Sequence, residues 1–212
     1  GLTYTDGALV IGGTTPSLTI GDAGAEDTKL VFDGNAQDFH IGLDDSADSL
    51  TIGLGSTLGT TSHMVMDSSG AITKPLQPAV LLTFGGEQSN VTGGGTEYTY
   101  GFNETIDRNG DFSGTTFTAP VTGLYVITLN NNISGVTSGH TQGRSYIDTS
   151  NREYYWNTNW YQIASSGSAG IAHTVIADMD ASDTCDFKVT LTGGAQTADV
   201  QASSTASVFL LG

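Results

Sequence analysis

Residues 112–129 read Phe112-Ser-Gly-Thr-Thr-Phe117-Thr-Ala-Pro120-Val-Thr-Gly123-Leu-Tyr125-Val-Ile127-Thr-Leu129. A proline followed three residues later by a glycine is typical of a turn, and the alternation of apolar residues after it predicts a strand. One face of this strand carries Tyr125, Ile127 and Leu129, and the other carries Leu124 and Val126. Because a strand with one side in water needs only one apolar face, we expect both faces of residues 123–129 to be covered.

The segments around this strand have the same character, with short apolar alternations separated by turn residues and no amphipathic helix. Their number is what a two-sheet sandwich of jelly-roll type requires. Within one of them, Cys185 alternates with Phe187, Val189 and Leu191, so we expect a buried, unreactive thiol. The predicted strands are 79–85, 97–106, 114–118, 123–131, 143–149, 154–161, 171–178, 185–192 and 205–211.

The phenylalanine, the proline-containing turn and the Gly-x-Tyr-x-apolar run resemble the globular head of the complement first subcomponent, the C-one-q type. That family shares the trimeric jelly roll of the tumour-necrosis-factor family, so the resemblance implies a homotrimer. It covers residues 76–212 and departs at Ile127, where an aromatic residue is usual. The matching positions are Phe102, Asn109, Phe112, Phe117, Pro120, Gly123 and Tyr125, with the closing strand 207–212.

Four further segments resemble the versions of this head that lie at the ends of bacteriophage fibres. This resemblance implies a location on the virion surface, other virion proteins as neighbours and a host-cell receptor as a partner. The segments are Asp67–Gly70, Gln77–Ala79, Ser150–Arg152 and Ala177–Asp183.

Residues 1–70 repeat a small unit, in which two apolar residues lie two positions apart and a glycine or aspartate follows. Each unit predicts a short strand that is too small to form a core alone. Because three copies around an axis would bury the apolar pairs in stacked layers, we expect an irregular trimeric β-structured shaft. A disordered arm is the alternative, which the Gly- and Ser-rich composition of 53–63 permits locally. The pairs are Leu9/Ile11, Leu18/Ile20, Leu30/Phe32, Phe39/Ile41, Leu50/Ile52 and Met64/Met66.

Two of the four prolines, Pro75 and Pro78, separate two segments of different composition. We therefore assign 1–70 to a β-repeat fibre shaft, 71–79 to a linker and 80–212 to the jelly-roll head.

Two histidines and one acidic run could each bind a metal ion or have a purely structural role. His40 alternates with an apolar pair and is expected to be exposed, whereas His63 is the better candidate for a three-nitrogen site on a trimer axis. The acidic run 178–183 lacks the glycine and distal glutamate of a calcium loop and predicts a turn. We predict neither a metal nor a cofactor.

The 212-residue chain is acidic, with 22 Asp and Glu residues against 6 Lys and Arg residues. Such a field repels nucleic acid, so nucleic acid is not an expected partner. No apolar run approaches the about 18 residues of a membrane span, and we expect no membrane insertion. The charged fraction of 13% is about half the usual value, which is typical of exposed extracellular or virion proteins. A start at Gly1, without Met or a signal sequence, indicates a piece of a longer protein.

Residues 151–162 hold both tryptophans and three of the eight tyrosines. Flat aromatic faces stack on sugars or protein side chains, and the amides between them supply directed hydrogen bonds. The alternative is that Tyr154, Trp156 and Tyr161 pack in the core or at a trimer contact. We predict a receptor-binding site formed by Tyr155, Trp156, Asn157, Asn159, Trp160 and Arg144, with Tyr155 and Trp160 as stacking groups.

No nucleophile elbow, HExxH pattern or zinc spacing accompanies the four histidines, so we do not expect an enzyme. We predict a trimeric fibre protein of a virion whose head recognises a glycan or protein on the host cell surface. The first alternative is a purely structural protein that trimerises a fibre or decorates a capsid. The second is a polysaccharide depolymerase.

Overall fold

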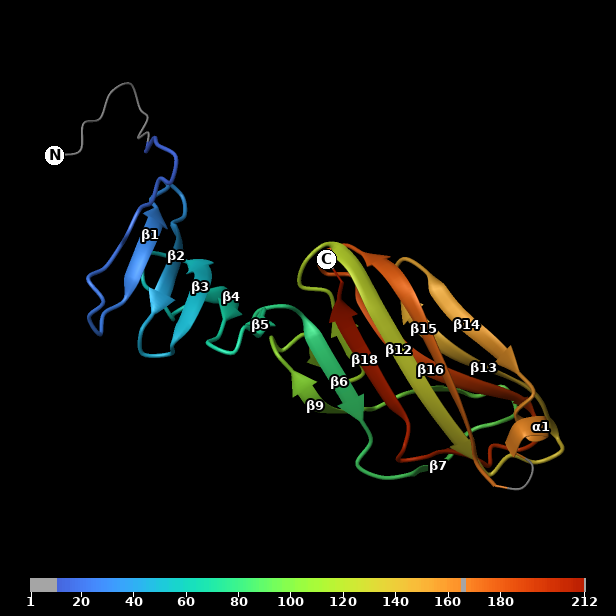
Figure 1. The fold of residues 1–212 in the computed structure, drawn as a ribbon. Coiled ribbons are helices and arrows are strands. Elements are labelled where there is room, and N and C mark those ends of the chain that lie inside the picture. The colour runs from blue at the N-terminus through green and yellow to red at the C-terminus, as the bar shows by residue number, and fades with distance from the viewer. Residues whose placement is uncertain (1–10, 165–166, 212) are drawn as a thin grey trace. The chain divides into compact units, whose positions relative to one another are not determined.

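The computed structural model describes residues 11–164 and 167–211, so Leu9 of the first apolar pair lies outside the described residues. The chain divides into two compact units, Gly1–Pro75 and Leu76–Gly212 (Figure 1). Both units consist of antiparallel β-sheet, and the helix α1 (Trp160–Ala164) lies in the second. No helix among the described residues is long and apolar enough to cross a membrane.

The first unit is a five-stranded meander in which each strand pairs with the next one along the chain. The sequence predicted three-residue strands that form no core within one chain, whereas the apolar pairs lie in strands of five and six residues that pair with one another within the chain. The pair Leu18/Ile20 precedes the sheet and forms no strand. The strands are β1 (Thr28–Phe32), β2 (Phe39–Asp44), β3 (Ser49–Leu54), β4 (Ser62–Met66) and β5 (Ile72–Thr73).

One face of the meander is closed by the loop of residues 55–61, which places Leu58 against Gly42. His40 points to this face, away from the apolar pair as predicted, but it is fully buried rather than exposed. Its Nδ1 atom lies 2.9 Å from the carbonyl oxygen of Gly55, and its ring fills the space where a side chain at Gly53 would stand. The overlying loop, which the repeat pattern does not reveal, is the physical reason for this difference.

The opposite face of the meander carries the apolar pairs, and Ile20, from the segment before β1, lines a depression at one side of it with Leu30 and Ile41. In the register, Leu30 lies opposite Ile41, Ile41 opposite Ile52, and Ile52 opposite Met64. The side chains on this face that are exposed by 37–56% are Leu30, Phe32, Phe39, Ile41, Leu43, Leu50, Met66 and Ile72. We call these eight residues the meander face.

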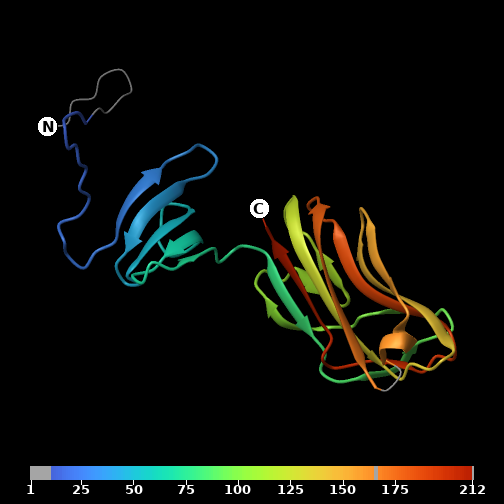
Figure 2. The same ribbon diagram turned by 45° about the vertical axis from the view of Figure 1, so that its right-hand side comes forward.

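The second unit is a sandwich of two antiparallel sheets, seen as two layers in Figures 1 and 2. Sheet I has the order β9-β6-β18-β12-β15, and β17 and β7 continue it beside the end of β12. Its strands are β6 (Ala79–Thr83), β7 (Gln88–Thr92), β9 (Asn103–Asp107), β12 (Gly123–Ser134), β15 (Ala169–Met179), β17 (Ala198–Val200) and β18 (Thr205–Leu210).

Sheet II has the order β10-β11-β16-β13-β14, with β8 also paired to β16. Successive strands from β11 to β18 cross between the sheets, except for β13–β14, which both lie in sheet II, and β17–β18, which both lie in sheet I. Four neighbouring strands of sheet I, β6-β18-β12-β15, face β11-β16-β13-β14, which is the strand order of an eight-stranded jelly roll. The strands of sheet II are β8 (Glu97–Thr99), β10 (Phe112–Ser113), β11 (Thr116–Thr118), β13 (His140–Thr149), β14 (Glu153–Thr158) and β16 (Thr184–Gly193).

The core lies between the two sheets, and β12 supplies its centre. Tyr125, Ile127 and Leu129 are fully buried, as the alternation predicted, and the hydroxyl of Tyr125 donates to the carbonyl oxygen of Val121 at 2.7 Å. The phenol of Tyr100 donates to the side-chain oxygen of Asn131, which satisfies two polar groups inside the core.

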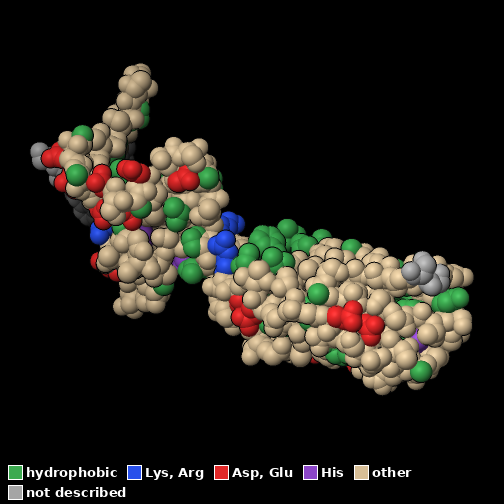
Figure 3. Space-filling model, turned by 90° about the horizontal axis from the view of Figure 1, so that it is seen from below, with side chains coloured by type: hydrophobic (Ala, Val, Ile, Leu, Met, Phe, Trp, Pro, Cys, Tyr) green, Lys and Arg blue, Asp and Glu red, His purple; other side chains and the backbone are tan. Residues whose placement is uncertain are grey.

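The outer face of sheet I is not covered within one chain, although both faces of residues 123–129 were expected to be covered. Leu124, Ile176 and Phe209 lie on this face and are each exposed by more than 40%. Val126 pairs with both Ile176 and Phe209, so these side chains form one patch across three strands. Figure 3 shows hydrophobic side chains gathered at one end of this unit.

Two predicted strands break where the chain changes sheet or direction. The predicted strand 97–106 splits around Gly101 into β8 in sheet II and β9 in sheet I. The predicted strand 154–161 ends at Thr158, and the chain then forms α1 across one end of the sandwich (Figure 2).

Native protein should resist thiol labelling at Cys185. This side chain is fully buried near the start of β16, and its burial was predicted; burial raises the pKa of its thiol, so little thiolate is present at neutral pH. Labelling with a maleimide should become fast only in denaturant. Equal rates in native and denatured protein would contradict the register of β16, because a slip of one residue would turn the thiol to the surface.

Candidate functional site

The outer face of sheet II, unlike that of sheet I, is polar and carries two tyrosines. Its side chains come from neighbouring strands in register, with Arg144 opposite Asn157 and Tyr146 opposite Tyr155. Gln142 lies two residues before Arg144 on the same side of β13. We call Gln142, Arg144, Tyr146, Tyr155 and Asn157 the aromatic–amide face.

Arg144 is held in place by its two neighbours on β14. Its Nε atom donates to the amide oxygen of Asn157 at 3.0 Å, and its guanidinium carbon lies 4.9 Å from the ring centre of Tyr155. Tyr155 is exposed by 45%, and its ring centre lies 6.0 Å from that of the buried Tyr146. Such contacts restrict flexible side chains before a ligand arrives, which lowers the entropic cost of binding.

A polar depression of about 300 Å³ adjoins this face at the open end of the β13–β14 hairpin, away from the turn that joins the two strands. Gln142 donates to the amide oxygen of Asn157 at 3.2 Å, so one amide oxygen receives donors from both Gln142 and Arg144. The lining presents amide and hydroxyl groups that match the hydroxyls of a sugar. It consists of Thr141, Gln142, Asn157, Thr158 and Asn159.

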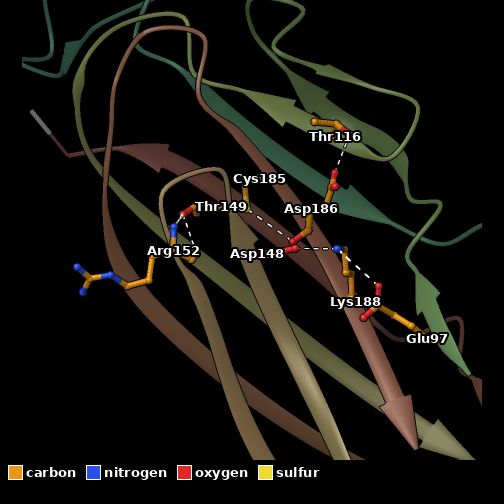
Figure 4. A network of polar contacts seen from close by, with 8 residues as sticks. All are labelled: Glu97, Thr116, Asp148, Thr149, Arg152, Cys185, Asp186 and Lys188. Atoms are coloured by element: carbon orange, nitrogen blue, oxygen red, sulfur yellow. Dashed lines mark hydrogen bonds and ion pairs between the residues drawn. The ribbon is translucent and has the colours of Figure 1, made fainter. Parts of the chain in front are cut away.

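The other cation on this face is neutralised by neighbouring carboxylates (Figure 4). Lys188 on β16 lies 2.7 Å from Asp148 and 3.6 Å from Glu97, and the hydrogen bond to Asp148 raises the pKa of the lysine. Asp186 accepts a hydrogen bond from the hydroxyl of Thr116 at 2.6 Å. This network joins four strands of sheet II and stiffens the sheet beside the aromatic–amide face.

The predicted site residues divide into three groups: four lie on or beside the aromatic–amide face, Trp156 lies on the other side of β14, and Trp160 lies in the core. Arg144, Tyr155 and Asn157 come together on the aromatic–amide face, and Asn159 lines the adjoining depression. Trp156 points to the other side of β14, where its ring stacks on His173 at a centroid distance of 4.1 Å. It is exposed by 37%, at the edge between β14 and β15.

Trp160 does not belong to the surface, and its assignment as a stacking group was wrong. Only 1% of it is exposed, because α1 turns its ring into the core, over Gly143 of β13. A side chain at Gly143 would overlap this ring, so glycine is required at that position. The β-alternation that was extended through residue 161 ends at Thr158, which changes the direction of every later side chain.

Gln142 and Tyr146 were not among the predicted site residues, because they lie on a different strand from the aromatic stretch. The signal that would have found them is the hairpin register, which places Tyr146 opposite Tyr155. The acidic run 178–183 forms a turn, as predicted, and the carboxylate of Asp183 accepts from the backbone amide of Asp180 at 2.7 Å. Among residues 11–164 and 167–211, no cluster of three or more His, Cys, Asp or Glu side chains is placed to hold a metal ion.

No family model and no curated protein matches the sequence. Among solved structures, the chain is similar to the globular domain of zebrafish complement 1qA protein, with 13% identity over 64% of this chain and 98% of that one and a TM-score of 0.43. It is also similar to murine APRIL, with 11% identity over 64% and 99% of the two chains and a TM-score of 0.46. For PRD1 vertex protein P5 the identity is 10% over 75% and 87%, with a TM-score of 0.47. The jelly-roll assignment of the second unit rests on the strand order of the chain itself.

Proposed function

We propose that this chain is a homotrimeric fibre protein on the surface of a phage virion, whose head binds a receptor on the host cell without turning it over. The observation that carries the proposal is the arrangement of Arg144 over Tyr155 and against Asn157, beside a depression lined by amides and hydroxyls. Fixed aromatic and amide groups of this kind suit the recognition of sugars or protein side chains.

The trimer in this proposal is supported by the outer face of sheet I. Leu124, Ile176 and Phe209 would be covered there by another copy, as two-sided apolar strands require. Three receptor sites at short separation would raise the effective affinity by about 10²–10⁴ without better contacts. Light scattering should give a mass three times that of the 21.9 kDa chain.

A purely structural protein that only caps and trimerises a fibre is the second candidate. The exposed apolar faces of both units favour it, because they would serve assembly even if no receptor were bound. Binding of the purified protein to host cells separates the two functions. Periodate treatment of the cells would abolish binding to a glycan, protease treatment would abolish binding to a protein, and a structural protein would bind neither treated nor untreated cells.

Replacing Tyr155 with alanine should weaken binding to host cells by at least about 30-fold, since truncation of a central anchor costs about 2 kcal/mol or more. Asn157→Ala should act in the same direction, because it releases Arg144 and Gln142 together. Tyr161→Ala is the matched control, since Tyr161 is an exposed aromatic of the same stretch outside the aromatic–amide face. Normal binding by Tyr155→Ala, with the control also normal, would exclude this face as the receptor site.

A further inference from the structure

The meander face is an unpartnered apolar sheet surface in a folded unit of the chain. We propose that it packs against the same face of two other copies, so that three complete sheets enclose one apolar core. The number of copies rests on the homotrimer of the proposed function. Two further parts of the proposal rest on the meander. Its exposed apolar side chains identify the face that makes the contact, and its strand pairing within one chain gives one folded sheet per copy.

The extent of the meander face matches what a stable contact between proteins needs. Its members lie in adjacent rows across the strands, since Leu43 pairs with Leu50, Leu50 with Met66, and Met66 with Ile72. Eight side chains of this size, each about half exposed, present on the order of 700 Å² in one copy, so three copies together would bury on the order of 2,100 Å². A surface of this size is larger than the largest apolar patch of a typical monomer.

The distribution of charge selects another copy of this chain as the occupant. None of the eight residues of the meander face is charged. The acidic residues of the described part of the unit lie at strand ends, in turns and in the segment before β1: Asp22, Glu26, Asp27, Asp33, Asp38, Asp44, Asp45, Asp48 and Asp67. In a chain of net charge −16, contacts through other surfaces would bring like charges together, whereas contacts through the meander face would not.

The reverse face of the same sheet cannot take this role, because the loop of residues 55–61 already occupies it. Thr51 and His40 are buried there, and the ammonium of Lys29 donates to the carbonyl oxygen of Ser56 at 2.6 Å. The meander of each copy therefore offers a single apolar face. This differs from a shaft in which short strands from three chains meet only at an axis, because the hydrogen bonds between strands are made within each copy.

Cysteine cross-linking of the full chain tests the proposal. In a Cys185→Ala background, Ile41→Cys places a thiol at the centre of the meander face, and Lys29→Cys places one on the reverse face, in the neighbouring row of the same strand pair. A short bismaleimide should link two chains of the Ile41→Cys trimer in high yield and leave Lys29→Cys unlinked.

The other outcomes separate this inference from the proposed function. A trimer by light scattering that binds host cells but gives no link at position 41 would overturn the inference and leave the proposed function standing. Equal linking at positions 29 and 41 would also overturn it, since either face would then lie near another copy. A monomer would overturn both, and a dimeric mass of the native protein by light scattering would exclude the three-sheet arrangement.

Discussion

Replacing Trp160 with alanine is expected to lower the free energy of unfolding by about 3–5 kcal/mol, the usual cost of truncating a large aromatic side chain in a core. Trp160 is among the largest fully buried side chains of the protein, and its ring fills the space above Gly143. The five-residue helix that carries it is too short to be stable alone, so its position depends on this packing. Denaturant unfolding at fixed protein concentration measures the effect.

The adjacent aromatic residue provides the control. Tyr161→Ala changes a side chain that is exposed by 38%, and its effect on the free energy of unfolding should stay within about 0.5 kcal/mol. At low temperature, where Trp160→Ala remains folded, receptor binding should be close to normal, because the ring does not reach the aromatic–amide face. Near-normal stability together with lost binding would show instead that Trp160 contacts the receptor.

The strands of the second unit were largely predictable because burial fixes which face of a strand is apolar. In 123–129 and 185–192 a shift of one residue would expose every core side chain, so the alternation determines the orientation. The alternation does not predict which other strand each strand pairs with. The predicted strand 97–106 therefore gave no sign that its two halves join opposite sheets around Gly101.

In the first unit, too, the sequence pattern did not predict how the strands pair. The apolar pairs correctly indicated short strands with one apolar side, but two-residue periodicity is the same whether strands pair within a chain or between chains. Turn residues after each pair allow the tight connections of a meander, and these make local pairing the arrangement with the shorter loops. The burial of His40 depends on the loop of residues 55–61, whose composition is also that of an open linker.

For the candidate site, the sequence located the aromatic stretch but not the direction of each ring. Tyr155 and Asn157 alternate on the outer side of β14, as a continuous strand predicts, and their partner Arg144 was also foreseen. Trp160 was misplaced because the strand ends two residues before it. Gln142 was missed because its contact with Asn157 depends on the hairpin register.

Acidification from pH 7.5 to pH 5 is expected to destabilise the protein through His173. This residue is exposed by 5%, its ring stacks on Trp156, and both ring nitrogens are buried without a hydrogen-bond partner in the described structure. Burial disfavours the imidazolium and lowers the pKa of His173 from 6.5 to about 4. The unfolded chain therefore binds a proton in this pH range that the folded chain does not bind.

The sign and size of the effect follow from this difference in proton binding. Because the folded pKa is the lower one, the contribution of His173 to stability is complete above about pH 6.5 and is lost as the pH falls toward 4. Its share of the loss between pH 7.5 and pH 5 should be about 2 kcal/mol, at about 1.4 kcal/mol per pH unit over the roughly 1.5 units below the unfolded pKa of 6.5. Hydrogen bonds lower the pKa of Asp107 and Asp183 from 3.8, so their contributions are lost only at more acidic pH.

His173→Phe isolates this contribution, since phenylalanine keeps an aromatic ring against Trp156 and cannot bind a proton. Denaturant unfolding at pH 7.5 and pH 5, at one protein concentration, should show a smaller loss of stability for the variant, by about 2 kcal/mol. Equal losses for the two proteins would mean that His173 finds a polar partner or solvent when it is protonated. The edge between β14 and β15 would then open readily in the native protein, and Trp156 would be freer to reach a ligand than its stacking on His173 indicates.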